Sequence, residues 1–130
     1  MFLAIIGLAF TLILFQDVAS AQTKEQTAAE LASQQADKLA DLLELEGWQV
    51  FYVDSTLQHD YAGMMDDLKG LQTSKVSNTD VYMAVRDKWN DRIDAALRKF
   101  FTEDQWNKYL KNGAAKAQKD RAKRAEKRNK

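Results

Sequence analysis

Apolar residues recur at helical spacing along most of the chain, and the longest such pattern lies between residues 50 and 71. Its positions follow one another at intervals of three or four residues: Val50, Val53, Leu57, Tyr61, Met64, Leu68 and Leu71. A strand would alternate at every second residue, so the pattern predicts a helix of about 33 Å with one apolar seam. Such a seam favours packing against a nearly antiparallel neighbour.

Two shorter amphipathic segments flank this helix. The apolar positions of residues 27–43 are Ala28, Leu31, Ala32, Leu39, Leu42 and Leu43. Those of residues 80–101 are Val81, Val85, Trp89, Ile93, Ala96, Leu97 and Phe100. Both patterns predict helices. The polar segment QTSKVSNT at residues 72–79 predicts a break between the second and third helices, because its side chains compete for backbone hydrogen bonds, and Asn78 or Thr79 can cap the third helix.

The segment FFTEDQW, residues 100–106, has the pattern of a helix start. Thr102 is expected to be the N-cap and to form a capping box with Gln105. Phe101 and Trp106 have the spacing of a hydrophobic staple across that cap. Local physics therefore predicts that the third helix ends here and a fourth begins.

A similar junction occurs 56 residues earlier, in LLELEGWQVFY at residues 42–52. Aligning Gln49 with Gln105 places Leu45 over Phe101 and Glu46 over Thr102. An apolar residue, a cap position, two intervening residues and a glutamine thus recur, and the two junctions divide the chain into halves.

These two motifs resemble those of the LTxxQ-motif family of small periplasmic proteins, to which Spy and CpxP belong. The resemblance covers roughly residues 28–110. The second motif, from Phe101 to Gln105, matches the family pattern, whereas the first, from Leu45 to Gln49, has Glu46 in place of threonine. The resemblance implies an all-α fold of about four helices, with two long amphipathic central helices in a Spy-like hairpin.

The resemblance also implies a function without catalysis or cofactor. Spy-like members form cradle-shaped antiparallel homodimers that bind partly unfolded envelope proteins without ATP, and CpxP-like members bind the periplasmic domain of a sensor kinase. The body of this chain departs from that pattern by being acidic: residues 22–110 hold 10 basic and 16 acidic residues. In a Spy-like cradle, basic residues line the apolar surface, so this difference bears on chaperone-like activity.

The N-terminus has the pattern of a secretory signal. Residues 1–15, MFLAIIGLAFTLILF, are almost entirely apolar, and Ala19-Ser20-Ala21 supplies a cleavage pattern before Gln22. We therefore expect a signal peptide at residues 1–21 and a periplasmic or secreted protein. No lysine or arginine precedes Lys24, so an uncleaved membrane anchor is the alternative. The mature part then comprises a helical domain at residues 22–112 and a basic tail at residues 113–130.

The tail reverses the charge of the body. Residues 111–130 hold nine basic and two acidic residues, interspersed with alanine. The tail can continue the fourth helix beyond Gly113 or stay disordered. Its expected partner is an anionic membrane surface, a polymer associated with peptidoglycan, or the acidic body of a second copy, with a purely solubilising role as the alternative. Nucleic acid is not expected as a partner of an exported protein.

Few residues point to chemistry. The chain has one histidine, His59, with Asp60 beside it, and no cysteine. A lone histidine makes a poor zinc or copper site, so a surface or interface histidine is the expectation, and no metal or cofactor is expected. The acidic pairs Asp66-Asp67 and Asp91-Asp94 have no neighbouring nucleophile or histidine, so they predict solvated helix faces and not an enzyme.

The aromatic residues are too numerous for a single apolar seam. Trp48, Phe51, Tyr52 and Tyr82 are predicted to form a second surface that binds partners, with ordinary core and rim positions as the alternative. We therefore expect a homodimeric interaction protein that binds unfolded or regulatory partners. The alternatives are a structural protein of the envelope that binds no clients, and a metal or ligand sensor.

Overall fold

The computed structural model describes residues 26–130, and the regular elements within that range are helical. They are α2 (Ala28–Leu43), α3 (Gly47–Thr73), α4 (Thr79–Phe100), α5 (Glu103–Tyr109), the kinked segment η1 (Leu110–Ala114) and α6 (Ala115–Arg128). The predicted all-α fold with two long central helices is confirmed. The expected signal peptide lies outside the described residues. No helix within residues 26–130 has the length and apolarity needed to cross a membrane.

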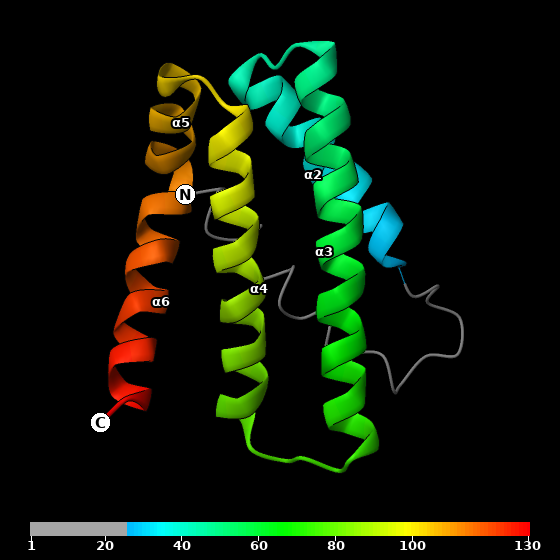
Figure 1. The fold of residues 1–130 in the computed structure, drawn as a ribbon, viewed down its shortest axis with the longest axis vertical. Helices are drawn as coiled ribbons and strands as arrows, with labels where there is room; N and C mark the ends of the chain where they lie inside the picture. The colour runs from blue at the N-terminus through cyan, green and yellow to red at the C-terminus, as the bar shows by residue number, and fades with distance from the viewer. Residues whose placement is uncertain (1–25) are drawn as a thin grey trace, which may run out of the picture.

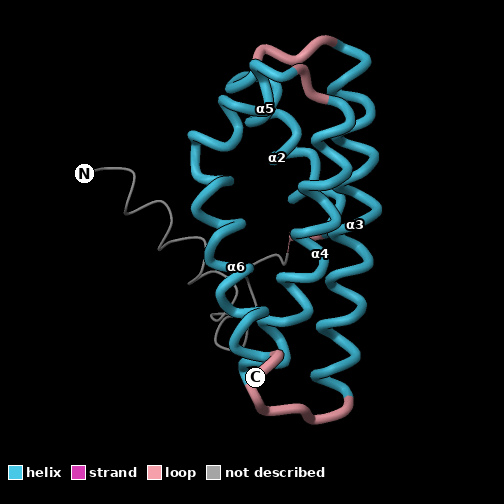
Figure 2. The backbone as a smooth tube through the Cα atoms, turned by 60° about the vertical axis from the view of Figure 1, so that its left-hand side comes forward, coloured by secondary structure: helices cyan, strands magenta, loops and turns pink. Residues whose placement is uncertain are grey.

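Helices α3 and α4 form a long antiparallel hairpin, closed at one end by residues 74–78 (Figure 1). At the other end, the α2–α3 and α4–α5 junctions lie side by side (Figures 1 and 2). Helix α2 packs on α3, and α6 runs back along α4. The tail is thus a helix that returns along the body of its own chain.

The chain between α5 and α6 is kinked, which changes its direction. Asn112 and Gly113 leave helical geometry, and Gly113 has a φ of 112°. Such a φ suits glycine, which has no Cβ to clash with the backbone. The tail is therefore helical, but as a separate helix, α6, that begins after a kink at Asn112 and Gly113 and does not simply continue the fourth helix.

The hydrophobic core lies towards the junction end of the hairpin. It contains Ala32, Ala36, Leu39, Leu43, Val53, Leu57, Ile93, Leu97, Phe101 and Trp106. The two alanines of α2 are almost completely buried, so their small side chains bring α2 close to its neighbours. Along α3 the buried residues lie between Gln49 and Asp60, although the apolar seam was predicted to reach Leu71. The second half of that seam is only partly buried.

One glycine sets how closely the hairpin helices approach beyond this core. Gly63 of α3 lies against the indole of Trp89 on α4, and a Cβ at this position would stand 2.9 Å from Cζ2 and closer still to Cη2. The Trp89 Nε1 donates a hydrogen bond of 2.7 Å to Asp67, and the guanidinium of Arg92 lies 4.6 Å from the ring centre. The indole bond is the main reason that the pKa of Asp67 lies below its usual value.

Gly63→Ala is therefore expected to lower the free energy of unfolding by about 1–2 kcal/mol, because overpacking costs more than the helix propensity of alanine returns. Gly70→Ala is the matched control on the same helix, since a Cβ there meets no atom within 4 Å. That control should raise the free energy of unfolding by about 0.5–1 kcal/mol. Urea unfolding followed by circular dichroism measures both changes. A stabilised Gly63→Ala variant would contradict the close packing.

Candidate functional site

The two predicted junction motifs meet in space through their glutamines. Nε2 of Gln49 donates to Oε1 of Gln105 at 2.7 Å, and Nε2 of Gln105 lies 3.3 Å from Oε1 of Gln49. Each amide also reaches the backbone of the other half: Gln49 donates to the Phe100 carbonyl at 2.8 Å, and Gln105 to the Leu43 carbonyl at 3.4 Å. The aligned motifs therefore form one reciprocal contact that joins the two halves of the chain.

Both glutamines also serve the starts of their own helices. Oε1 of Gln105 accepts from the Thr102 N–H, and the Thr102 hydroxyl accepts from the Gln105 N–H, which confirms the predicted capping box. Phe101 and Trp106 are buried with ring centres 6.5 Å apart, as the staple predicts. At the first junction, Oε1 of Gln49 accepts from the backbone N–H of Glu46 at 2.8 Å.

The departure of the first motif from the family pattern has a local consequence. The carboxylate of Glu46 accepts a hydrogen bond of 2.8 Å from the indole Nε1 of Trp48. Leu45, before the cap, packs against the hydrophobic core. Glu46 thus fixes an indole that lies on the surface, which a threonine side chain is too short to do.

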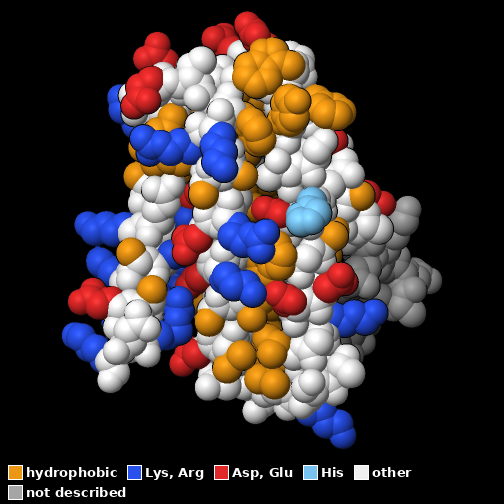
Figure 3. All heavy atoms as spheres, in the orientation of Figure 1, with side chains coloured by type: hydrophobic (Ala, Val, Ile, Leu, Met, Phe, Trp, Pro, Cys, Tyr) orange, Lys and Arg blue, Asp and Glu red, His pale blue; other side chains and the backbone are white. Residues whose placement is uncertain are grey.

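Beside the first junction, aromatic side chains form an exposed group that we call the junction cluster, consisting of Trp48, Phe51, Tyr52 and Phe100. Their exposed fractions are 53% for Trp48, 66% for Phe51 and 48% for Tyr52. The Tyr52 ring stacks on Phe100 at 5.3 Å and contacts Phe51 and Trp48 edge-on at 5.5 and 6.3 Å. Figure 3 shows hydrophobic side chains gathered at this end of α3 and α4.

The fourth predicted surface aromatic, Tyr82, lies elsewhere. It is half-buried near the opposite end of the hairpin, and its hydroxyl donates to the Val76 carbonyl at 2.6 Å. The structure therefore brings together Trp48, Phe51 and Tyr52 but not Tyr82. Phe100, which the sequence pattern assigned to the core seam, is half-buried: it packs against the hydrophobic core and stacks on the exposed Tyr52.

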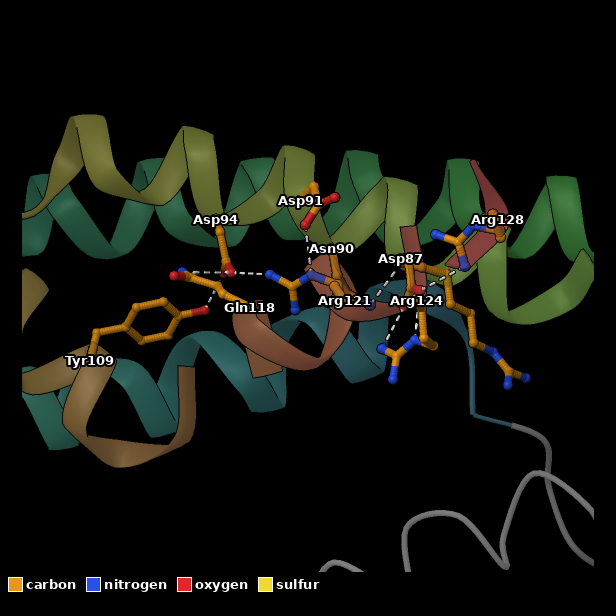
Figure 4. A network of polar contacts seen from close by, with 10 residues as sticks. Asp87, Asn90, Asp91, Asp94, Tyr109, Gln118, Arg121, Arg124 and Arg128 are labelled. Atoms are coloured by element: carbon orange, nitrogen blue, oxygen red, sulfur yellow. Dashed lines mark hydrogen bonds and ion pairs between the residues drawn. The ribbon is translucent and has the colours of Figure 1, made fainter. Parts of the chain in front are cut away.

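A network of ion pairs joins α4 to α6 (Figure 4). Asp94 accepts hydrogen bonds from the Tyr109 hydroxyl at 2.6 Å, from Gln118 at 3.0 Å and from Arg121. Arg121 also donates to Asp91 at 2.7 Å. One carboxylate thus satisfies donors from α5 and α6 at once.

Farther along the same interface, Asp87 accepts from Arg124 at 2.8 and 2.9 Å and from Arg128 at 3.4 Å. Burial raises the pKa of Asp87, but the hydrogen bonds and charges of Arg124 and Arg128 outweigh burial, so the pKa of Asp87 lies below its usual value. Asp87 and Asp94 are 3% and 8% exposed, so the prediction that the Asp91-Asp94 face is solvated is wrong for Asp94. Their burial follows from coverage by the arginine side chains of α6.

A cavity of about 260 Å³ opens beside this network, between α2, α3, α4 and the kinked segment η1. Leu39, Leu57, Ile93 and Leu97 provide apolar lining, and Tyr61, Asp94 and Tyr109 are among the polar residues that line it. Burial, reinforced by the charge of Asp94, raises the pKa of both tyrosines, so their hydroxyls remain protonated at neutral pH. The cavity therefore offers hydroxyl groups and no activated nucleophile.

His59 pairs with its sequence neighbour. Its Nδ1 lies 2.8 Å from Asp60, and 75% of the histidine side chain is exposed. Within residues 26–130, no three histidine, cysteine, aspartate or glutamate side chains are grouped so that they could hold a metal ion. Asp66 and Asp67, predicted to lie on a solvated helix face, are exposed on the same helix as His59.

Compared with known proteins, the chain matches no protein-family model, no curated protein and no solved structure.

Proposed function

We propose that this chain is an exported, non-catalytic protein-binding module, related to the LTxxQ-motif family, that holds exposed apolar segments of other polypeptides on its junction cluster. The observation that carries the proposal is the exposure of Trp48, Phe51 and Tyr52 in one contiguous group. Aromatic side chains supply large contact areas with few rotatable bonds, and they are enriched at protein interfaces.

The surroundings of the cluster support a preformed binding surface. The Tyr52 ring stacks on Phe100, and the Trp48 indole donates a hydrogen bond to Glu46. The buried amide of Gln49 holds the start of α3 in place beneath these rings. The cavity is lined by other residues, and the cluster itself presents ring faces and edges on the surface. Such a surface suits an extended apolar segment better than a small ligand.

The contact between the motif glutamines supports the proposed kinship. The resemblance rests on two motifs that are 56 residues apart, and the structure joins their glutamines by a hydrogen bond of 2.7 Å. A chance recurrence of the pattern would not require the two glutamines to meet. Glu46 stands where the family has threonine, yet its backbone N–H still donates to Oε1 of Gln49, as in a capping box.

The proposal predicts that the purified protein suppresses aggregation of a chemically unfolded model protein at a near-stoichiometric ratio. Replacing Phe51 and Tyr52 together by alanine should weaken this suppression roughly tenfold, as removal of interface anchors typically does. The matched control replaces Val81 and Met83 by alanine, since both are exposed apolar residues on α4 towards the other end of the hairpin. That control should leave suppression unchanged.

Molar mass from light scattering, measured on the same samples, separates this function from self-association. Equal suppression by both double variants, or no suppression by the wild type, would refute binding of clients on the junction cluster. A third outcome would assign the cluster to a homodimer interface. In that case the wild type is a dimer that does not suppress aggregation, and only the Phe51/Tyr52 double variant is a monomer.

A further inference from the structure

The basic residues of α6 divide between two faces according to type. Arg121, Arg124 and Arg128 face α4 and bind its aspartates. The lysines recur at intervals of three or four residues and form what we call the lysine stripe: Lys116, Lys119, Lys123 and Lys127 of α6, and Lys130 just beyond its end. At 100° per residue, this spacing places the four lysines within the helix along a different side of α6 from the arginines.

The lysine stripe is solvent-exposed and has more positive than negative charge, since Asp120 and Glu126 are the two acids of α6 beside its five lysines. All five lysines are exposed, and Figure 3 shows basic side chains projecting from the outer edge of α6. Within the described part of the chain, Lys116 is the only one of the five with a carboxylate within 4.0 Å, its partner being Asp120 at 2.8 Å. The acids of α4 neutralise the arginines, so the remaining positive charge of α6 faces outward.

We propose that the lysine stripe docks α6 side-on against the surface of an anionic lipid bilayer. The four lysines of the stripe within α6 span about 17 Å, from 11 residues at 1.5 Å each, along one helix face. Lysine is a hydrated point charge on a flexible stem, without the rigid fork by which arginine recognises a single carboxylate or phosphate. A straight row of such charges fits an extended field of lipid phosphates better than one bound anion.

The apolar side chains of α6 indicate that the contact is electrostatic and superficial. The residues between the lysines are mainly alanine and charged residues, and no aromatic or large aliphatic side chain lies in Ala115–Arg128. Membrane-inserting helices carry such bulky residues opposite their basic face. A lipid surface is preferred to other polyanions because the signal peptide expected at residues 1–21 would export the chain across a membrane whose lipid phosphates then lie nearby.

Vesicle sedimentation of the full chain tests the proposal. Vesicles of neutral phosphatidylcholine are compared with vesicles that also contain anionic phosphatidylglycerol, at low and high salt. At low salt, the full chain should bind the anionic vesicles more tightly than the neutral ones. A triple variant should lose roughly tenfold of this added affinity; its substitutions are Lys119→Gln, Lys123→Gln and Lys127→Gln. Binding to neutral vesicles, which includes any contribution from residues 1–15, should be the same for all variants.

The control removes the same charge elsewhere, by replacing Lys38, Lys69 and Lys99 with glutamine on α2, α3 and α4. All three lysines are exposed, so net charge changes equally while the lysine stripe stays intact. Equal weakening by both triple variants would show a net-charge effect and overturn the proposal. So would an absence of any gain from anionic lipid, or stripe-dependent binding to soluble polyglutamate but not to vesicles, which would indicate an acidic polymer or protein as partner.

Discussion

Asp94→Asn is expected to lower the free energy of unfolding by about 3 kcal/mol, because it leaves the buried Arg121 with only the exposed carboxylate of Asp91. Donors from Tyr109, Gln118 and Arg121 converge on the two Asp94 oxygens. An asparagine offers one oxygen and turns an NH₂ group towards donors that need an acceptor. The change preserves shape, so the loss reports the polar network and not a cavity.

Asp91→Asn is the matched control, since Asp91 binds the same Arg121 on the same helix but its side chain is 65% exposed. Water can replace its bond, so the expected loss is below about 1 kcal/mol. Urea unfolding followed by circular dichroism compares the two variants. Trypsin provides a second measurement: Asp94→Asn should speed cleavage after Arg121 by loosening α6, whereas Asp91→Asn should change it little. Equal losses of stability from the two variants would contradict the importance of the buried carboxylate.

The helices were predictable from sequence because their signals are local. The 3.6-residue periodicity, the polar segment before Asn78 and the cap pattern at Thr102 all act within a few residues along the chain. The observed ends of α2, α3 and α4 consequently agree with the predicted ones to within a few residues. The staple and the second capping box were predictable for the same reason, since Phe101 and Gln105 contact their own junction.

The burial of Asp87 and Asp94 was not predicted, because helical periodicity identifies polar faces but not what covers them. A signal was nevertheless available. The aspartates at 87, 91 and 94 have spacings of four and three, and the arginines at 121, 124 and 128 have the same spacings in reverse order. Two antiparallel helices place such sets opposite each other. The tail was expected to bind an acidic partner. For the arginines of the tail, that partner is the acidic face of α4 in the same chain.

The aromatic surface was partly predictable. One apolar seam could not accommodate every aromatic residue, which correctly indicated that Trp48, Phe51 and Tyr52 lie outside the core. Sequence spacing alone did not place Tyr82, because its position depends on the turn at residues 74–78, whose Val76 carbonyl accepts its hydroxyl. Nor did it predict the contact of Gln49 with Gln105, which depends on the docking of the two halves.

That contact makes Gln49→Glu the second variant with a large expected effect. Nε2 of Gln49 lies 2.8 Å from the Phe100 carbonyl and 2.7 Å from Oε1 of Gln105, and the residue is 2% exposed. A carboxylate oxygen in its place would face two acceptors in a buried site. Gln105 is poorly placed to compensate by rotating its amide, since its Oε1 also accepts from the Thr102 N–H. The free energy of unfolding should fall by about 3 kcal/mol at neutral pH.

The loss should depend on pH with a defined sign. In the folded variant, burial favours the protonated form of Glu at position 49, and its O–H can donate to one of the two acceptors. The pKa of this carboxyl group is therefore higher in the folded state than the unfolded value of about 4.3. The destabilisation therefore grows as pH rises from the unfolded pKa to the folded pKa, and it is smallest in acid. Gln34→Glu is the control: this position is exposed on α2 with Lys38 one turn later, and the change should stay within about 0.5 kcal/mol. Urea unfolding of both variants between acid and neutral pH measures the difference. A loss for Gln49→Glu that does not vary with pH would show that the introduced carboxylate reaches water and that the two junctions are not joined by a buried amide pair.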